Sequence, residues 1–336
     1  MLYVTTRNNS DAFTAHRTMT NHFGPDGGGF VPFRMPYFDN SQLLHLKEKS
    51  FNENVADVLN LFFSTQLTNW DLDFGIGRNL LRISALNQKI LIAELWHNLE
   101  GDYNYIESML FQKITPESGA DITKWSQIAI RVAVLFGIYG QMLRQNSIRL
   151  GEHFAFSVRN DDFVTPIAAL YCREMGMPIN TVICACNEEG NLWDFIHRGF
   201  INTANITTNM QNGVERLLQL TLGCTLAADF SAACEQKRTF TIAETDLPRL
   251  NNALFCSVSG KERAQSIINS LYRTSAYIID DDAALSYGGL QDYRAKVGDS
   301  QLIVILSEKC PLLCADEITA ATGLAADMIN KHINQA

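Results

Sequence analysis

Residues 152–186 alternate between two apolar patterns, and this alternation restricts the fold more than any other feature of the sequence. EHFAFSV (152–158) has the apolar run of a buried strand, TPIAALYCREMG (165–176) has helical spacing and ends at Gly176, and INTVICAC (179–186) is again strand-like. A strand, helix and strand in this order form a parallel unit, whose loops at the carboxyl ends of the strands usually hold ligands. The sequence therefore predicts an α/β fold with a parallel sheet.

The same alternation extends over most of the chain. A strand is expected at KILIAELW (89–96) and a long helix at 121–145. The C-terminal part continues with a helix, the short strand AYIIDD (276–281), a helix, the strand SQLIVILS (300–307) and a last helix. We expect two domains: residues 1–90, a helical N-terminal region with a first strand, and residues 91–336, an α/β domain.

The composition excludes several classes of protein. A net charge of -9 and the lack of a basic run argue against a nucleic-acid partner, because phosphate binding needs a basic surface. The start has no signal-peptide pattern, and the longest apolar passage (127–143) contains Arg131, which indicates a buried helix and no membrane partner. The eight cysteines match no zinc or redox spacing. We therefore expect a cytoplasmic protein with reduced thiols, most of them in the core.

Several segments carry a more specific signal. They are YVTTR, GPDGGGFVPFRMP, AELWHNLEGDYNYIES, SVRNDDFVTPIAALYCREMGMPINTVICACNEEG, TTNMQNGVERLLQ and YIIDDDAALSYGGL. In this order they resemble motifs of threonine synthase, a pyridoxal-phosphate enzyme. The resemblance implies the tryptophan synthase β-like fold (pyridoxal-phosphate fold type II), with a sheet, flanking helices and a helical N-terminal region. GPDGGGF itself lacks the spacing of a nucleotide loop and indicates a turn that lays the first strand against the main domain.

The resemblance also locates the position of the family's catalytic lysine, which forms the Schiff base with the cofactor. That lysine lies seven positions after the histidine of the ELFH motif, and counting from His97 leads to Asn104. An amide nitrogen has no nucleophilic lone pair, so no imine forms at this position. We therefore expect a degenerate family member without pyridoxal phosphate; Lys113 and Lys124 are the nearest lysines in the sequence.

Three further departures point the same way. The glycine-rich phosphate cup of the family corresponds here to Asp161, Asp162, Phe163 and Val164, whose carboxylates would repel a phosphate. A small subdomain that covers the cofactor in the family has no room between residues 113 and 125, because a βαβ unit needs about thirty residues. The family's DPHT motif is replaced by Asp280, Asp281, Asp282 and Ala283. The chain is thus expected to be a truncated member.

Polar residues near the expected ligand edge leave two interpretations open. Glu94 and His97, with Asp282, are the candidate catalytic residues, and Glu100 and Asp102 lie close by in the sequence. Carboxylates and a histidine could provide acid-base chemistry or bind a divalent metal, although no metal site can be assigned. Alternatively, these groups satisfy local backbone or act as helix caps. Converging aspartates would form a negative pocket that favours an amine or a cation.

Two functions are therefore weighed. The first is a homologue that has lost pyridoxal-phosphate catalysis and binds a small amino-acid-like ligand or a protein partner, with a homodimer as the expected assembly. The alternative is an enzyme with new acid-base or metal-assisted chemistry on an amino-acid-like substrate, in a specialised biosynthetic pathway. The enzyme predicts His97 and at least two carboxylates within hydrogen-bond reach of one point, whereas the binding protein predicts dispersed carboxylates.

Overall fold

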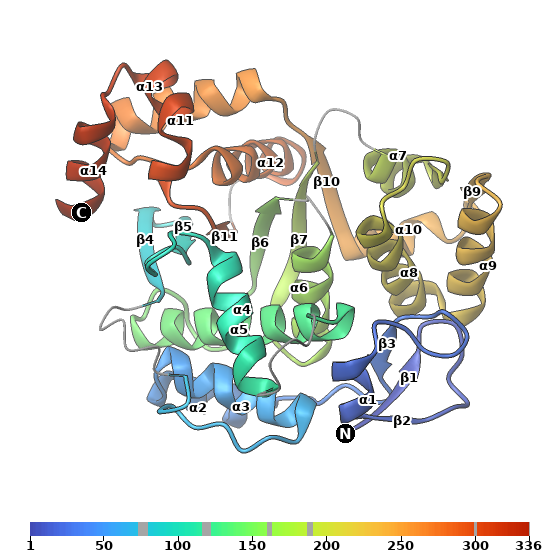
Figure 1. The fold of residues 1–336 in the computed structure, drawn as a ribbon. Coiled ribbons are helices and arrows are strands. Elements are labelled where there is room, and N and C mark those ends of the chain that lie inside the picture. The colour runs from blue at the N-terminus through green and yellow to red at the C-terminus, as the bar shows by residue number, and fades with distance from the viewer. Residues whose placement is uncertain (73–79, 116–121, 160–162, 187–190, 299–300, 336) are drawn as a thin grey trace.

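The computed structural model describes residues 1–72, 80–115, 122–159, 163–186, 191–298 and 301–335. Its centre is a six-stranded sheet formed by β4 (Arg82–Asn87), β5 (Ile90–Glu94), β6 (Phe154–Arg159), β7 (Ile179–Cys186), β10 (Leu254–Val258) and β11 (Leu302–Ser307). The strand order is β10-β7-β6-β11-β5-β4 (Figure 1). All strands from β10 to β5 in this order run parallel, and β4 pairs antiparallel with β5 at one edge. The expected α/β fold is confirmed.

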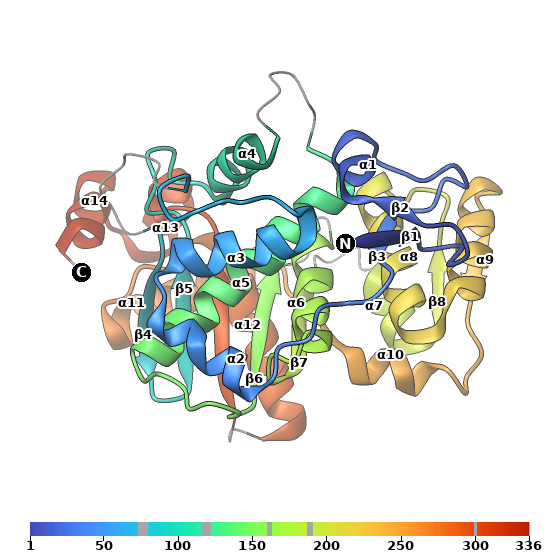
Figure 2. The ribbon, with the colours of Figure 1, turned by 90° about the horizontal axis from the view of Figure 1, so that it is seen from below.

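Alternate residues of the strands face two separate cores. Ala155, Ile183 and Ile303 belong to the core under α11 (Lys261–Ser275), α12 (Asp281–Val297), α13 (Ala315–Thr322) and α14 (Ala326–Gln335). Phe156 and Val304 belong to the other core, which is covered by α3 (Phe51–Phe63), α5 (Lys124–Arg144) and α6 (Val164–Glu174). Figure 2 shows α3 lying along α5 on this second face. Burial on both faces explains the apolar runs that predicted the strands.

The predicted parallel unit is β6, α6 and β7. Gly176 follows α6 with a φ of +98°, and its amide donates to the carbonyl of Arg173. Glycine adopts this left-handed conformation without the steric cost of a Cβ atom. Figure 1 shows the unit at the middle of the sheet.

The strand expected at residues 276–281 does not form. This segment belongs to none of the sheets that the described residues form. Instead, Asp280 caps the N-terminus of α12, where its Oδ1 accepts a hydrogen bond of 2.8 Å from the amide of Ala283. Ile278 and Ile279 are nevertheless buried, which explains the apolar pattern that suggested a strand.

The N-terminal segment begins with a small antiparallel sheet of β1 (Leu2–Thr5), β2 (Phe13–Thr14) and β3 (Phe30–Pro32), with α1 (Ala15–Thr20) beside it. α2 (Asn40–His45) and the 3-10 helix η1 (Leu46–Glu48) lead into α3. Both α2 and α3 start with complete capping boxes, at Asp39 and Ser50. The apolar residues of 40–66 are spaced as in helices, and the two caps explain why one helix begins after Asp39 and a second one after Ser50.

The GPDGGGF segment connects the small sheet to a second group of helices: α7 (Asn191–Arg198), α8 (Thr208–Leu222), α9 (Cys224–Glu235) and α10 (Leu247–Ala253), with the two-stranded sheet of β8 (Phe200–Asn202) and β9 (Thr239–Thr241). Arg216 of α8 is fully buried, and its Nη2 donates to the carbonyl of Phe30 at 3.0 Å. A Cβ atom on Gly29 would lie 2.6 Å from Arg216 Nη1. A glycine is therefore required for this close approach.

α5 is long and apolar enough, by length and composition only, to cross a membrane. In the structure, however, 89% of its most apolar window is buried inside the protein. It packs against α3 and α6, and Tyr139 stacks on Phe154 of β6 with ring centroids 5.8 Å apart. α5 is therefore a helix of the protein core.

Candidate functional site

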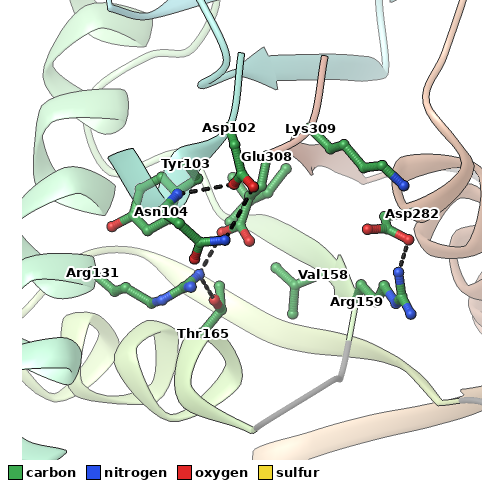
Figure 3. Close-up of a pocket in the computed structure, with 11 residues that line it drawn as sticks. Asp102, Tyr103, Asn104, Arg131, Val158, Arg159, Thr165, Asp282, Glu308 and Lys309 are labelled. Carbon is green, nitrogen blue, oxygen red and sulfur yellow. Dashed lines mark hydrogen bonds and ion pairs between the residues drawn. The ribbon is translucent and has the colours of Figure 1, made fainter. Parts of the chain in front are cut away.

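A cavity of about 200 Å³ lies where β6 and β11 end and where α4 (Tyr103–Ile114) and α6 begin. This is the carboxyl edge of the parallel sheet, where the sequence predicted a ligand. Its charged walls comprise three cationic and three acidic side chains: Arg131, Arg159, Lys309, Asp102, Asp282 and Glu308. Asn104, Tyr103, Val158, Thr165 and Leu306 complete the lining. Figure 3 shows the charged groups on two sides of the cavity, with Val158 between them.

The first side is organised by Arg131, which reaches the cavity from the buried helix α5. Its Nη1 donates to Glu308 Oε1 at 2.6 Å and to the hydroxyl of Thr165, the second residue of α6. The guanidinium also lies over the ring of Tyr103, 4.5 Å from its centroid. One arginine thus connects β11, α4 and α6 around the cavity, and its charge explains why an otherwise apolar helix carries it.

The second side consists of two ion pairs. Arg159, the last residue of β6, pairs with Asp282, and Lys309 Nζ lies 2.9 Å from Asp281 Oδ1. Burial opposes the charged form of Lys309, but the hydrogen bond to Asp281 outweighs it and raises the pKa of the ammonium. Lys309 is therefore protonated at neutral pH. The expected excess of negative charge is not found among the described residues, because cationic side chains pair with the carboxylates.

Asn104 lies at the start of α4 and lines the same cavity (Figure 3). Asp102 caps this helix, and its Oδ1 accepts from the Asn104 amide at 2.9 Å. The side-chain amide of Asn104 donates to Asp102 Oδ2 at 3.1 Å. The position that corresponds to the family's lysine thus faces a carboxylate that also serves as a helix cap.

The segment corresponding to the phosphate cup is described only in part. Asp161 and Asp162 lie outside the described residues. Phe163 is the N-cap of α6 with a φ of +63°, and its fully buried ring packs where a Cβ atom on Gly213 would lie 2.5 Å from it. Val164 follows as the first helical residue and is also buried. Of these two, only Val164 stands at a position where the resemblance places a glycine, and its Cβ atom restricts the backbone of such a loop.

Glu94 and His97 are in contact, but outside the cavity lining. Glu94 is fully buried, and its two oxygens bind Arg82 Nε at 2.7 Å, His97 Nε2 at 2.7 Å, Ser84 Oγ at 2.6 Å and Tyr277 OH at 2.8 Å. Burial opposes its ionisation, but the hydrogen bonds from His97, Arg82 and Ser84 prevail and lower its pKa. Asp282, the third predicted catalytic residue, lies in the cavity and pairs with Arg159 instead.

Comparisons with known proteins agree with this geometry. A family model described as "Threonine synthase N terminus" matches residues 2–78. Human Threonine synthase-like 1 is 25% identical over 181 residues, which is 50% of this chain and 24% of that protein. Mouse Threonine synthase-like 2 is 27% identical over 108 residues, or 30% of this chain and 22% of that protein. The chain is therefore similar to threonine synthase-like proteins over parts of its length.

Solved structures show the same fold for this threonine synthase-like protein. The threonine synthase of Brucella melitensis, with bound pyridoxal phosphate, has a TM-score of 0.77 at 17% identity and covers 96% of this chain and 92% of its own. Yeast threonine synthase has a TM-score of 0.76 at 14% identity, covering 99% and 94%. At these low identities, the likeness shows that the chain has the fold type II architecture and shows nothing about its activity. In sequence, the chain spans about a quarter of the length of the human relative that it matches.

Two groups of side chains in the threonine synthase-like protein are close enough to hold a metal ion. Oxygens of Asp280, Asp281 and Asp282 lie within 4.8 Å of one another, but Lys309 and Arg159 pair with the second and third. The sulfurs of Cys184, Cys186 and Cys256 are equally close, on the neighbouring strands β7 and β10. Burial raises the pKa of Cys184 and Cys256 well above that of a free thiol, which favours the protonated form.

Sequence reasoning missed the cations of the cavity. Arg131 was assigned to a buried helix without a role, and neither Arg159 nor Lys309 was considered. A sequence signal existed for Arg159 and Lys309, because Arg159 directly follows the predicted strand 152–158 and Lys309 follows the predicted strand 300–307 by two residues. Nothing local could have connected Arg131 to them, since its partner Glu308 is 177 positions away.

Proposed function

We propose that this threonine synthase-like protein binds a small zwitterionic amino acid in the cavity between β6 and β11, without pyridoxal-phosphate catalysis. The observation that supports this proposal is the balanced set of three cations and three carboxylates around about 200 Å³. A carboxylate can be held by Arg131 or Lys309 and an ammonium by Asp102 or Glu308, because charge-assisted hydrogen bonds are the strongest of their kind. A phosphate ester would meet as much repulsion as attraction.

Pyridoxal phosphate does not fit the residues present. Asn104 supplies no amine for an imine, and Lys309, the lysine in the cavity lining, is held protonated by Asp281. Val164 carries a side chain at a position where the resemblance places a glycine of the phosphate cup. Threonine synthase activity is therefore not part of the proposal.

The enzyme alternative receives less support from the geometry. It required His97 and two carboxylates around one point, but His97 contacts Glu94, while Asp282 pairs with Arg159. Glu94 is fully buried and engaged by four partners, as expected of a structural carboxylate.

Cytoplasmic localisation and a homodimer remain part of the proposal. A second copy could cover two exposed apolar side chains that lie close in sequence to cavity residues. They are Leu99 and Leu313, which are 72% and 54% exposed.

Calorimetric titration with L-threonine, the product indicated by the names of the relatives, tests the proposal. We expect binding, and no binding of 1-amino-2-propanol or 3-hydroxybutanoate, which each lack one of the two charges. Lys309→Gln and Asp102→Asn should each weaken binding roughly tenfold to a hundredfold. The exposed Lys47→Gln serves as the matched control and should bind as the wild type does.

A second experiment addresses the cofactor. Absorbance spectra with added pyridoxal phosphate, followed by borohydride reduction and intact mass, should reveal no adduct on the wild-type protein. A reduced adduct on a single lysine would contradict the proposed loss of pyridoxal-phosphate chemistry. Failure of L-threonine and other small zwitterions to bind would contradict the proposed ligand.

A further inference from the structure

A second cavity, of about 400 Å³, adjoins the first. It lies between α11 and α12, and one wall is apolar, formed by Ala264 and Ile268 of α11 and Leu285 of α12. The two cavities share Arg159 and Asp282, which line both. Lys309 of the first cavity also pairs with Asp281 of the second, so two ion pairs lie between the cavities among the described residues.

The ion pair between Arg159 and Asp282 separates the two cavities only weakly. The side chains of Arg159 and Asp282 are 35% and 23% exposed, so solvent screens their attraction and the pair contributes little to stability. A zwitterion held by the charged groups of the first cavity can also turn its carboxylate toward Arg159 and its ammonium toward Asp282, and so replace each partner of the pair by a group of the same charge. The number of ion pairs is then conserved or increased while the partition opens.

We infer that the preferred ligand is an α-amino acid with a long, unbranched apolar side chain that extends past Arg159 and Asp282 onto the wall of Ala264, Ile268 and Leu285. This inference rests on the proposed function, because the charged end of the ligand occupies the first cavity. The first cavity is lined mainly by charged and polar side chains, so an extended hydrocarbon gains affinity by leaving it. Ala264 and Ile268 are buried and Leu285 is half-buried, so they form a preformed surface.

Calorimetry with a homologous series tests the inference. The probes are L-alanine, L-norvaline, L-norleucine and L-2-aminooctanoate, which differ only in the number of methylene groups. We expect the affinity to rise roughly fourfold per methylene, the factor that corresponds to the transfer of one methylene from water. Leu285→Asn should reduce the gain in affinity per methylene. Gln265 is half-buried, and Gln265→Leu, which extends the apolar wall, should increase that gain. Leu61→Asn, an exposed leucine of α3, is the matched control.

Each outcome distinguishes the inference from the proposed function. A flat series in which L-alanine and L-threonine still bind would overturn the inference and leave the proposed function standing. A rising series that Leu285→Asn and Gln265→Leu do not change would place the side chain elsewhere and also overturn the inference. If no member of the series and no other small zwitterion binds, both fail together. The gain expected for Gln265→Leu cannot result from misfolding, which would only weaken binding.

Discussion

At the scale of single residues, Gly29 and Arg216 depend on each other. The peptide of Gly29 passes the buried guanidinium so closely that a Cβ atom would lie 2.6 Å from it. We expect Gly29→Ala to lower the free energy of unfolding by about 3 kcal/mol, as overpacking of a core does. Urea denaturation measures this. Gly151→Ala is the control: its methyl would meet no atom within 4 Å, and only the φ of +75° should cost about 1 kcal/mol. Equal effects of the two variants would contradict the close approach.

Asp280 should make stability depend on pH in the neutral range. Complete burial raises its pKa from 3.8 to about 7, although Ser307 and the Ala283 amide favour its charged form. Because the folded state prefers the protonated acid, the contribution of Asp280 to stability is complete below pH 3.8 and is lost as the pH rises to about 7. The loss is on the order of a few kcal/mol.

Asp280→Asn tests this expectation, since asparagine cannot ionise but can still cap α12. Relative to the wild type, the variant should become more stable between pH 5 and pH 8 in urea denaturation. Asp11→Asn, at an exposed position, should show no such trend. A constant difference across this range would mean that Asp280 ionises with its ordinary pKa. Glu94 does not interfere, because its lowered pKa places its own loss of stability at acidic pH.

At the scale of secondary structure, the Glu94 network attaches the edge strand β4 to the sheet. Arg82 and Ser84 of β4 both bind Glu94 of β5, and Arg82 is the register partner of Glu94 in the β4–β5 ladder. We expect Glu94→Gln to destabilise the protein by about 2 kcal/mol, since it leaves Arg82 and His97 without their carboxylate. Hydrogen exchange of the β4 amides should increase most.

Glu48→Gln provides the matched control for Glu94→Gln. Glu48 also pairs with a histidine three residues away, His45 at 3.0 Å, but both side chains are more than 60% exposed. Its loss should change stability by less than about 0.5 kcal/mol. Equal stability of the two variants, combined with lost ligand binding in Glu94→Gln alone, would favour the enzyme alternative over the structural role.

The elements show where sequence patterns suffice. β6, α6 and β7 could be predicted because strand and helix periodicities are local and Gly176 marks the end of the helix. The segment 276–281 could not, because the burial of Ile278 and Ile279 gives it the apolar pattern of a strand although it pairs with none. The position of the cavity, at the carboxyl edge of the sheet, could be predicted. The cations of the cavity could not, because Arg131 meets Glu308 only through the tertiary fold.

At the scale of the whole molecule, one apolar core connects the N-terminal region to the α/β part. Tyr3 of β1 and Phe62 of α3 both contact Trp125 of α5, with ring centroids 5.4 and 5.3 Å apart. The division at residue 90 remains a prediction. We expect a single cooperative unfolding transition, because neither part can lose this contact without exposing the other. Coincident urea curves from circular dichroism and tryptophan fluorescence would support it, whereas early hydrogen exchange confined to residues 1–90 would contradict it.

The cap of α4 bears on whether a lysine at position 104 could react with an aldehyde. A lysine placed at position 104 would find Asp102, which already accepts two hydrogen bonds from Asn104. The carboxylate would hold the new amine as an ammonium ion, which cannot attack an aldehyde. Removing Asp102 to free the amine would also remove the cap. We therefore expect Asn104→Lys alone to introduce a lysine at this position without the reactivity that a Schiff base needs.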